Sequence, residues 1–215
     1  MKIKMSVYKR YKSKLLVVEG IDGSGKTTFC KILYSHLCSQ GIDVILSEEP
    51  TNGPYGKQIK KLLAQNFLSV SNDELIELFL KDRKWHIEHV ILPALSKGQI
   101  VLLDRYYLST VAYQGAIEGG DPEKIYLMHK KIVIDPDLVI FIDVDPEVAL
   151  QRITKRNKTQ SFFETKEFLK KEREIYLKFL PRFKYISVLN YYSPACLKDA
   201  VKSICLFEIL PVLKA

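Results

Sequence analysis

The sequence predicts an α/β fold of three layers, in which helices cover both faces of a central parallel sheet. Two observations carry this prediction. Short, almost wholly apolar segments alternate with stretches long enough for helices, which is typical of βαβ units. The apolar segments also lack the alternation of a half-exposed strand, as expected of central strands buried on both faces. A length of 215 residues suits one such domain.

In the first half of the chain, the pattern predicts three strands and three helices. The strands are expected at residues 15–19, 43–47 and 100–103. The helices are expected at residues 26–40, 56–64 and 73–96, with a loop over residues 49–55. Gly41 is a typical stop for the first helix. Pro93 should kink the long third helix or end its first part, because proline cannot donate a backbone hydrogen bond.

The second half is expected to add two strands and four helices. The strands are predicted at residues 138–144 and 184–188. The helices are predicted to start at residues 121–123, at Pro146, at residue 164 and at about residue 197. Proline at the first helical position supports the first two of these starts.

Positive charge is concentrated at the N-terminus. The formal net charge is +8, and residues 1–14 hold six lysines or arginines and no acid. Such an arm can touch nucleic acid or a membrane surface, but it is more often a solvated tail. We therefore divide the chain into a basic arm, residues 1–13, and a single domain, residues 14–215, and expect neither nucleic acid nor a membrane as a partner.

The composition gives no sign of insertion into a membrane or of export. No apolar run reaches the 18 or so residues that a membrane-spanning helix needs. The first residues also lack the apolar region of a secretory signal. A cytoplasmic location is the expectation.

A phosphate-binding loop follows the first predicted strand. Residues 20–27 match the pattern G-x-x-x-x-G-K-[ST] without a mismatch. The glycines let successive backbone N–H groups point at one anion, and the next helix adds its positive end. Lys26 should reach the β- and γ-phosphates, and the Thr27 hydroxyl should ligate Mg²⁺. The residues predicted to contact the nucleotide here are Gly20, Asp22, Gly23, Ser24, Gly25, Lys26, Thr27 and Thr28.

An acidic and a basic residue follow the third predicted strand. Asp104, Arg105 and Tyr106 come at its carboxyl end, where parallel sheets bind their ligands. Asp104 can hold Mg²⁺ or orient an attacking phosphate, and Arg105 can grip a phosphate as a two-pronged fork. Taken alone, the same three residues also fit an ordinary helix start.

Five ordered segments resemble the thymidylate kinase family, over roughly residues 14–190. They are residues 18–28, 49–51, 78–83, 104–115 and 136–152, of which 104–115 is the most specific. The resemblance implies a P-loop NTPase fold with a small lid segment. It also implies transfer of the γ-phosphoryl group of ATP to dTMP, giving dTDP and ADP for dTTP synthesis, with Mg²⁺ as cofactor. Family members are usually homodimers, so a homodimer is expected.

The resemblance also assigns roles to an acceptor site. Asp22 would accept a hydrogen bond from the sugar 3′-OH, Phe79 would stack on thymine, and two arginines would hold the monophosphate. The expected acceptor residues are Asp22, Glu49, Pro50, Phe79, Arg83, Arg105, Ser109, Tyr113 and Gln114. Thr27 and Asp104 would serve the metal. Periodicity alone would place Phe79 and Tyr113 in the core.

Residues 152–163 form the expected lid. Residues 152–158 are basic and, as a plain charge run, would be a solvated helix end, but they resemble the family's segment that closes over ATP. Gly23 stands where some members carry an arginine, and members without that arginine use lid arginines instead. The resemblance therefore implies that Arg152 binds ATP and that Arg156 is the catalytic arginine, acting with Lys26, Asp104 and Arg105.

Some positions depart from the family pattern, and other functions stay open. Glu48 stands where many relatives have arginine, Asn52 and Gly53 replace residues that help with the acceptor in some members, and Ser161 replaces a common aspartate. One alternative is a kinase for another nucleoside monophosphate. A second is a nucleotide-binding regulator without turnover. A third, suggested by the basic arm, is a P-loop protein that acts on nucleic acid.

Overall fold

A computed structural model describes residues 12–65, 70–156, 165–190 and 194–215. Its five strands form one all-parallel sheet in the order β2-β3-β1-β4-β5. The strands are β1 (Leu15–Glu19), β2 (Val44–Glu48), β3 (Ile100–Asp104), β4 (Leu138–Asp143) and β5 (Tyr185–Leu189). The predicted parallel sheet is confirmed, and each strand boundary lies within one residue of the expected one.

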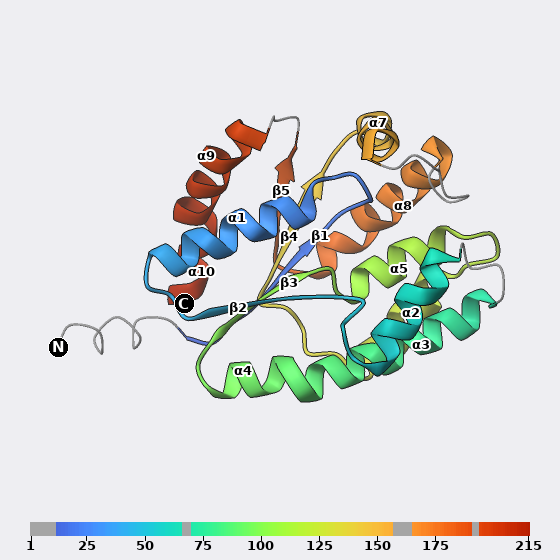
Figure 1. Ribbon diagram of the computed structural model, residues 1–215, viewed down its shortest axis with the longest axis horizontal. Coiled ribbons are helices and arrows are strands. Elements are labelled where there is room, and N and C mark those ends of the chain that lie inside the picture. The colour runs from blue at the N-terminus through green and yellow to red at the C-terminus, as the bar shows by residue number, and fades with distance from the viewer. Residues whose placement is uncertain (1–11, 66–69, 157–164, 191–193) are drawn as a thin grey trace.

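Helices cover both faces of this sheet, as Figure 1 shows. They are α1 (Lys26–Ser39), α2 (Pro54–Ala64), α3 (Asn72–His86), α4 (Leu92–Ser96), α5 (Tyr107–Ala116), α6 (Pro122–Lys130), α7 (Pro146–Arg156), α8 (Lys166–Phe179), α9 (Pro194–Ile204) and α10 (Leu210–Lys214). Helices α1, α9 and α10 lie on one face, and α3, α5 and α8 lie on the other (Figure 1). The three-layer α/β fold is therefore confirmed. No helix among the described residues is long and apolar enough to cross a membrane.

The core consists of two buried clusters, one on each face of the sheet. Successive residues of β1 alternate between them: Leu15 and Val17 join the cluster under α5 and α8, whereas Leu16 and Val18 join the cluster under α1 and α9. Because both faces are covered, neither set of side chains can be polar. This two-sided burial explains why the strands read as continuous apolar runs.

Helix α5 is an element that the pattern did not predict. Nine of its ten residues are buried, and Tyr113 is the exception. Ser109, Thr110 and Gln114 are buried with the rest, so α5 lacks the solvent-exposed polar face by which an amphipathic helix is recognised. Helix α2 also starts two residues earlier than expected, because Pro54 occupies the first helical position, where a missing N–H is harmless. The last helical stretch likewise begins at Pro194 rather than near residue 197.

The long third helix keeps its helical course past Pro93 through a change of helix type. The α-helix ends at His86, and a π-helical turn, Ile87–Ile91, follows, with Leu92 N–H donating to the carbonyl of Ile87. Pro93 then lies in the first turn of α4, where its missing N–H costs nothing. The predicted interruption is real, although the chain stays helical. Residues 205–209 repeat this device before Pro211.

Candidate active site

The predicted site residues gather at the carboxyl ends of β1, β2 and β3. Val18 and Asp104 are register partners, so the phosphate-binding loop and the Asp104–Tyr106 turn begin side by side. The chain leaves β1 for β2 on one side and later returns to β4 on the other, so the strand order reverses beside β1. This is the position at which open α/β sheets bind their ligands.

Glycine is required at the centre of the phosphate-binding loop. Gly23 has φ of 76°, and a Cβ atom there would lie 2.4 Å from the carbonyl oxygen of Ala149 on α7. Helix α7 therefore packs directly on the position where some relatives carry arginine. In this arrangement any side chain at position 23 would require α7 to move.

Lys26 folds back onto its own loop. Its Nζ donates to the carbonyl of Ile21 at 2.6 Å and lies 3.5 Å from Ser24 Oγ. Burial, together with the charge of Arg105, lowers the pKa of Lys26 to about 8. Phosphate oxygens in the loop would raise this pKa again, because an anion favours the charged form of the ammonium group.

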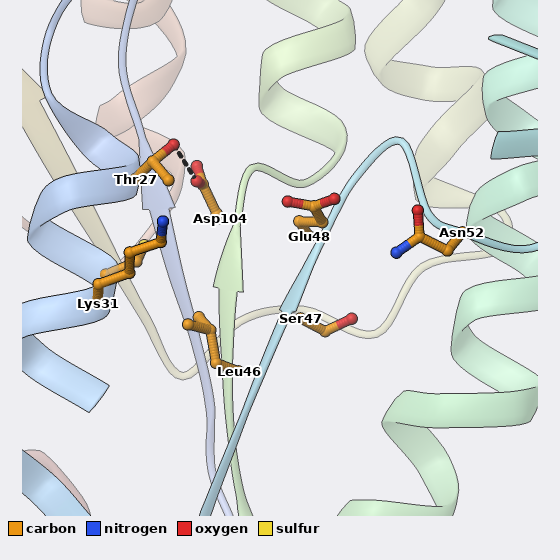
Figure 2. A pocket seen from close by; sticks show the side chains of 8 residues that line it. Thr27, Lys31, Leu46, Ser47, Glu48, Asn52 and Asp104 are labelled. Atoms are coloured by element: carbon orange, nitrogen blue, oxygen red, sulfur yellow. Dashed lines mark hydrogen bonds between the residues drawn. The ribbon is translucent and has the colours of Figure 1, made fainter. Parts of the chain in front are cut away.

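Thr27 and Asp104 form a pair of oxygen ligands next to the loop. The Thr27 hydroxyl donates to Asp104 Oδ2 at 2.5 Å, as Figure 2 shows. Asp104 Oδ1 is buried and has no hydrogen-bond partner among the described residues. Beside the pair opens a cleft of about 370 Å³, which Lys31 and Glu48 also line. A hydroxyl and an unpaired carboxylate oxygen are the ligand types that Mg²⁺ prefers, so the residues fit a metal here.

A second cavity, of about 210 Å³, brings all nine expected acceptor residues together. Its lining consists of Asp22, Glu49, Pro50, Leu63, Phe79, Arg83, Arg105, Tyr106, Ser109, Thr110, Tyr113 and Gln114. The resemblance had assigned no acceptor role to Leu63, Tyr106 or Thr110. The cavity offers an aromatic face at Phe79 and an amide at Gln114, which suit a pyrimidine base, with Arg105 available for an anion.

Arg105 has an unusual backbone conformation. Its φ of 74° is left-handed, the only positive φ at a non-glycine residue in the described part of the chain. Such strain costs on the order of 1–3 kcal/mol and is typical of functional sites. The side chain pairs with Asp22 and donates to Ser109 Oγ at 3.3 Å. Although burial opposes its charge, Asp22 and other nearby acids keep the pKa of Arg105 raised.

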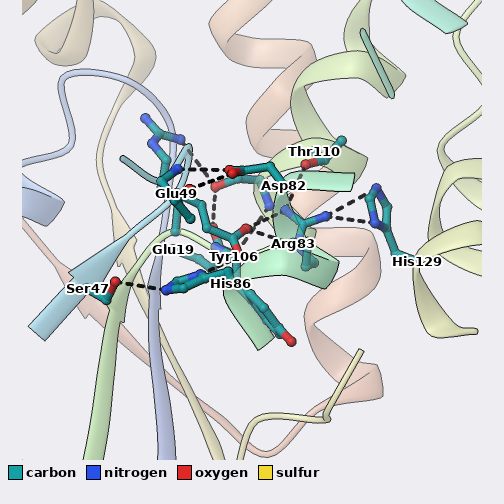
Figure 3. A network of polar contacts seen from close by, with 12 residues as sticks. Glu19, Ser47, Glu49, Asp82, Arg83, His86, Tyr106, Thr110 and His129 are labelled. Carbon is teal, nitrogen blue, oxygen red and sulfur yellow. Dashed lines mark hydrogen bonds and ion pairs between the residues drawn. The ribbon is translucent and has the colours of Figure 1, made fainter. Parts of the chain in front are cut away.

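Arg83 is more buried than Arg105, and its guanidinium contacts polar side chains on several sides (Figure 3). Its Nε and Nη2 donate to Glu49 Oε2 at 2.9 and 2.6 Å, and Nη2 also donates to Thr110 at 3.1 Å. Its Nη1 lies 2.7 Å from Nδ1 of His129. Burial raises the pKa of Glu49, but Arg83 and His86 outweigh it, so the net pKa is lowered. Of the two arginines, Arg105 is the freer to meet a phosphate.

Comparison with known proteins decides the family. The family model described as thymidylate kinase matches residues 18–201. The chain belongs to the thymidylate kinase family. It is similar to proteins named thymidylate kinase from Desulfotalea psychrophila, at 46% identity over 82% of this chain and 86% of the relative. A protein of the same name from Xanthomonas campestris pv. campestris strain B100 is 43% identical over 75% of this chain and 70% of the relative. Another, from Brachyspira hyodysenteriae, is 40% identical over 78% of this chain and 81% of the relative.

In this thymidylate kinase family member, side chains of α3 hold the loop between β2 and α2 in place. Thr51 donates through its backbone N–H and its hydroxyl to the two carboxylate oxygens of Asp82, at 2.8 and 2.5 Å. A Cβ atom on Gly53 would come within 2.6 Å of the Trp85 ring, which stacks on His89 with ring centroids 4.7 Å apart. Gly53 therefore allows the loop to lie against the indole.

Glu19 supports the predicted site in a way that the sequence analysis did not foresee. This buried carboxylate accepts from the backbone N–H groups of Tyr106 and Ser109 at 3.0 and 3.3 Å, and from the hydroxyls of Ser109 and Tyr176 at 2.5 and 3.2 Å. It thus holds the turn that carries Arg105. Burial raises the pKa of Glu19 to about 7. A charged residue ending an otherwise apolar strand was the available signal.

The lid side of the site is described in part. Arg152 Nη1 lies 3.4 Å from the carbonyl of Gly23, and Nη2 donates to the carbonyl of Asn190 at 3.0 Å. Asn190 in turn donates to the carbonyl of Ser24 at 2.5 Å, so Arg152 does lie at the phosphate-binding loop. Arg156 is the last residue of α7, but its side chain and lid residues 157–163 lie outside the described part.

Glu172 on α8 is buried, and neither of its carboxylate oxygens has a hydrogen-bond partner among the described residues. Burial, followed by the charge of Asp22, raises its pKa from 4.5 to about 8. As pH rises, Glu172 ionises near pH 4.5 in the unfolded chain but only near pH 8 in the folded protein. Its contribution to the free energy of unfolding is therefore fully present below about pH 4.5 and is lost by about pH 8.

Glu172→Gln keeps the shape but cannot ionise. It should therefore be more stable than the wild type at alkaline pH, with a difference that grows by at most about 1.4 kcal/mol per pH unit between those two pKa values. Urea unfolding at several pH values measures this difference. Glu174→Gln, at an exposed position of the same helix, is the control. A difference that does not change with pH would contradict the prediction.

Proposed function

We propose that the protein transfers the γ-phosphoryl group of ATP to dTMP, giving dTDP and ADP for dTTP synthesis. The observation that carries the proposal is the acceptor cavity, which holds all nine expected residues and shares Asp22 with the phosphate-binding loop. An oxygen of the dTMP phosphate would form the new bond to the γ-phosphorus. The bond between that phosphorus and the bridging oxygen would break, and ADP would leave.

Each side chain has a task in this reaction. Lys26 would hold the β- and γ-phosphates through its ammonium group, and Arg105 would hold the acceptor phosphate. The two cations would offset the repulsion between the two anions that must meet. Phe79 would stack on the base, and Gln114 would bond to its polar edge. Arg83, which Glu49 anchors, would help orient the acceptor.

Mg²⁺ would be held by Thr27 and Asp104, whose oxygens fit it. When bound, the ion neutralises charge on the phosphates. Arg152 would bind ATP from the lid side, and Arg156 would supply the catalytic arginine that Gly23 cannot. The lid, residues 152–163, would close over ATP and exclude water. We further propose one catalytic domain, residues 14–215, preceded by a basic arm, and a homodimer in the cytoplasm.

The first test is release of ADP from ATP and Mg²⁺ with a panel of dTMP, dUMP, dCMP, dGMP and AMP. Strong turnover with dTMP is the expected result. Preference for another monophosphate would keep the phosphoryl transfer but overturn the assignment of the base pocket. Folded, ATP-binding protein that shows no acceptor-dependent turnover would replace the kinase with a nucleotide-binding regulator.

A further inference from the structure

His129 is a buried histidine that the assigned roles leave out. It lies in the last turn of α6, is 0% exposed, and is 46 residues from Arg83 in the sequence. Its Nδ1 lies 2.7 Å from Nη1 of Arg83, and its Nε2 lies 3.3 Å away. Figure 3 shows the ring facing the guanidinium from the side opposite to Glu49.

His129 accepts a hydrogen bond from Arg83. Burial, together with the charge of Arg83, lowers the pKa of His129 to about 2, so the ring is uncharged at neutral pH. A guanidinium has only donors, so the short contact requires a lone pair on the imidazole. The nearer nitrogen, Nδ1, is therefore the acceptor, and the ring proton lies on Nε2.

The contact with His129 is the fourth hydrogen bond of the Arg83 guanidinium, which has five N–H groups. The Nε of Arg83 donates to Glu49, Nη2 donates to Glu49 and Thr110, and Nη1 donates to His129. Partners on three sides fix both the position and the plane of the group, since each donor direction of a guanidinium is rigid. An apolar ring at position 129 would leave a buried N–H without a partner.

The uncharged state of His129 also matters for the charge balance around Arg83. Glu49 already balances the charge of Arg83, and His86 bonds to the other oxygen of Glu49 at 2.9 Å. A second carboxylate in place of His129 would make this part of the cavity negative, which would oppose an anionic nucleotide. A neutral acceptor orients Arg83 without that cost.

We propose that His129 is a positioning residue for the acceptor nucleotide: its hydrogen bond from Nη1 holds Arg83 in the single orientation that dTMP meets. This inference rests on the proposed function, because it takes the cavity that Arg83 lines as the acceptor site. His129 itself does not line that cavity, so it acts through Arg83 and touches no substrate.

The test compares two substitutions in the full-length protein. His129→Phe keeps a planar ring without an acceptor, and His129→Asn keeps an acceptor oxygen near the place of Nδ1. The phenylalanine variant should raise KM for dTMP by about tenfold or more, because Arg83 loses a buried partner. Its KM for ATP and its kcat should change less than about twofold. The asparagine variant should recover most of the affinity for dTMP.

Three results would overturn the proposal: an unchanged KM for dTMP in His129→Phe, an equal rise in KM for ATP, or an asparagine variant as impaired as the phenylalanine variant. Thermal unfolding checks the fold, and His129→Met replaces the phenylalanine variant if that variant does not fold. His36→Phe, at a partly exposed histidine of α1 that does not line the cavity, is the control. Wild-type turnover tests the proposed function separately. If another monophosphate is the acceptor, its KM is compared, and without turnover the Kd for dTMP is compared.

Discussion

Lys26→Met is expected to lower kcat by about 10³-fold or more, the largest effect of any single substitution in this protein. Lys26 places a positive charge inside the phosphate-binding loop, and positioned charge supplies most of the catalysis in phosphoryl transfer. Methionine has a similar length and suits the buried site, where the Nζ atom now contacts the carbonyl of Ile21. Steady-state ADP formation at saturating ATP and dTMP measures the change.

The fold of this variant should survive, because removing a buried charge removes its desolvation cost. Thermal unfolding of Lys26→Met should therefore give a Tm at or above that of the wild type. Lys57→Met, at an exposed position of α2, is the matched control and should keep full activity. A loss of less than tenfold in Lys26→Met would mean that other groups carry the charge stabilisation.

Removing the side chain of Arg105 should have the second largest effect. Arg105→Ala and Arg105→Gly are each expected to lower kcat/KM for dTMP by about 10²- to 10³-fold, because the acceptor phosphate loses its charged partner. KM for ATP should change much less. Initial rates over a range of dTMP concentrations measure the effect.

The same two variants separate function from backbone strain. Glycine adopts a φ of 74° freely, whereas alanine does not, so Arg105→Gly should be more stable than Arg105→Ala by about 1 kcal/mol. Activity should be lost equally in both. If the glycine variant were much more active than the alanine variant, the backbone conformation and not the guanidinium would be the functional feature.

The sequence predicts the sheet well because burial on two sides leaves a strong apolar signal in each strand. The nine acceptor residues of the second cavity were expected from the family resemblance, because periodicity alone would have placed Phe79 and Tyr113 in the core. The loop before Lys26 and the turn at Asp104 follow neighbouring parallel strands, and this neighbourhood brings together residues as distant as Asp22 and Gln114. The pairing of the strands therefore determines where a motif at the end of a strand lies.

The remaining features depend on packing that no local pattern records. Arg83 meets Glu49 and His129 only because segments 34 and 46 residues away pack around α3. Glu172 falls between Leu169 and Tyr176 on the buried face of α8, as helical spacing predicts, but the spacing gives no sign that its carboxylate has no hydrogen-bond partner among the described residues. Helix α5 is buried on nearly all sides, and its polar side chains line the cavity instead of facing solvent. In each case tertiary contacts, which periodicity cannot describe, determine the outcome.

The contact between Gly53 and the indole of Trp85 gives the molecule a built-in optical reporter. Trp85 is the only tryptophan in the chain, so the long-wavelength ultraviolet fluorescence comes almost entirely from one position. That fluorophore lies against the loop whose earlier residues, Glu49 and Pro50, line the acceptor cavity. Its emission is therefore sensitive to the surroundings of this loop, without an attached dye or an engineered label.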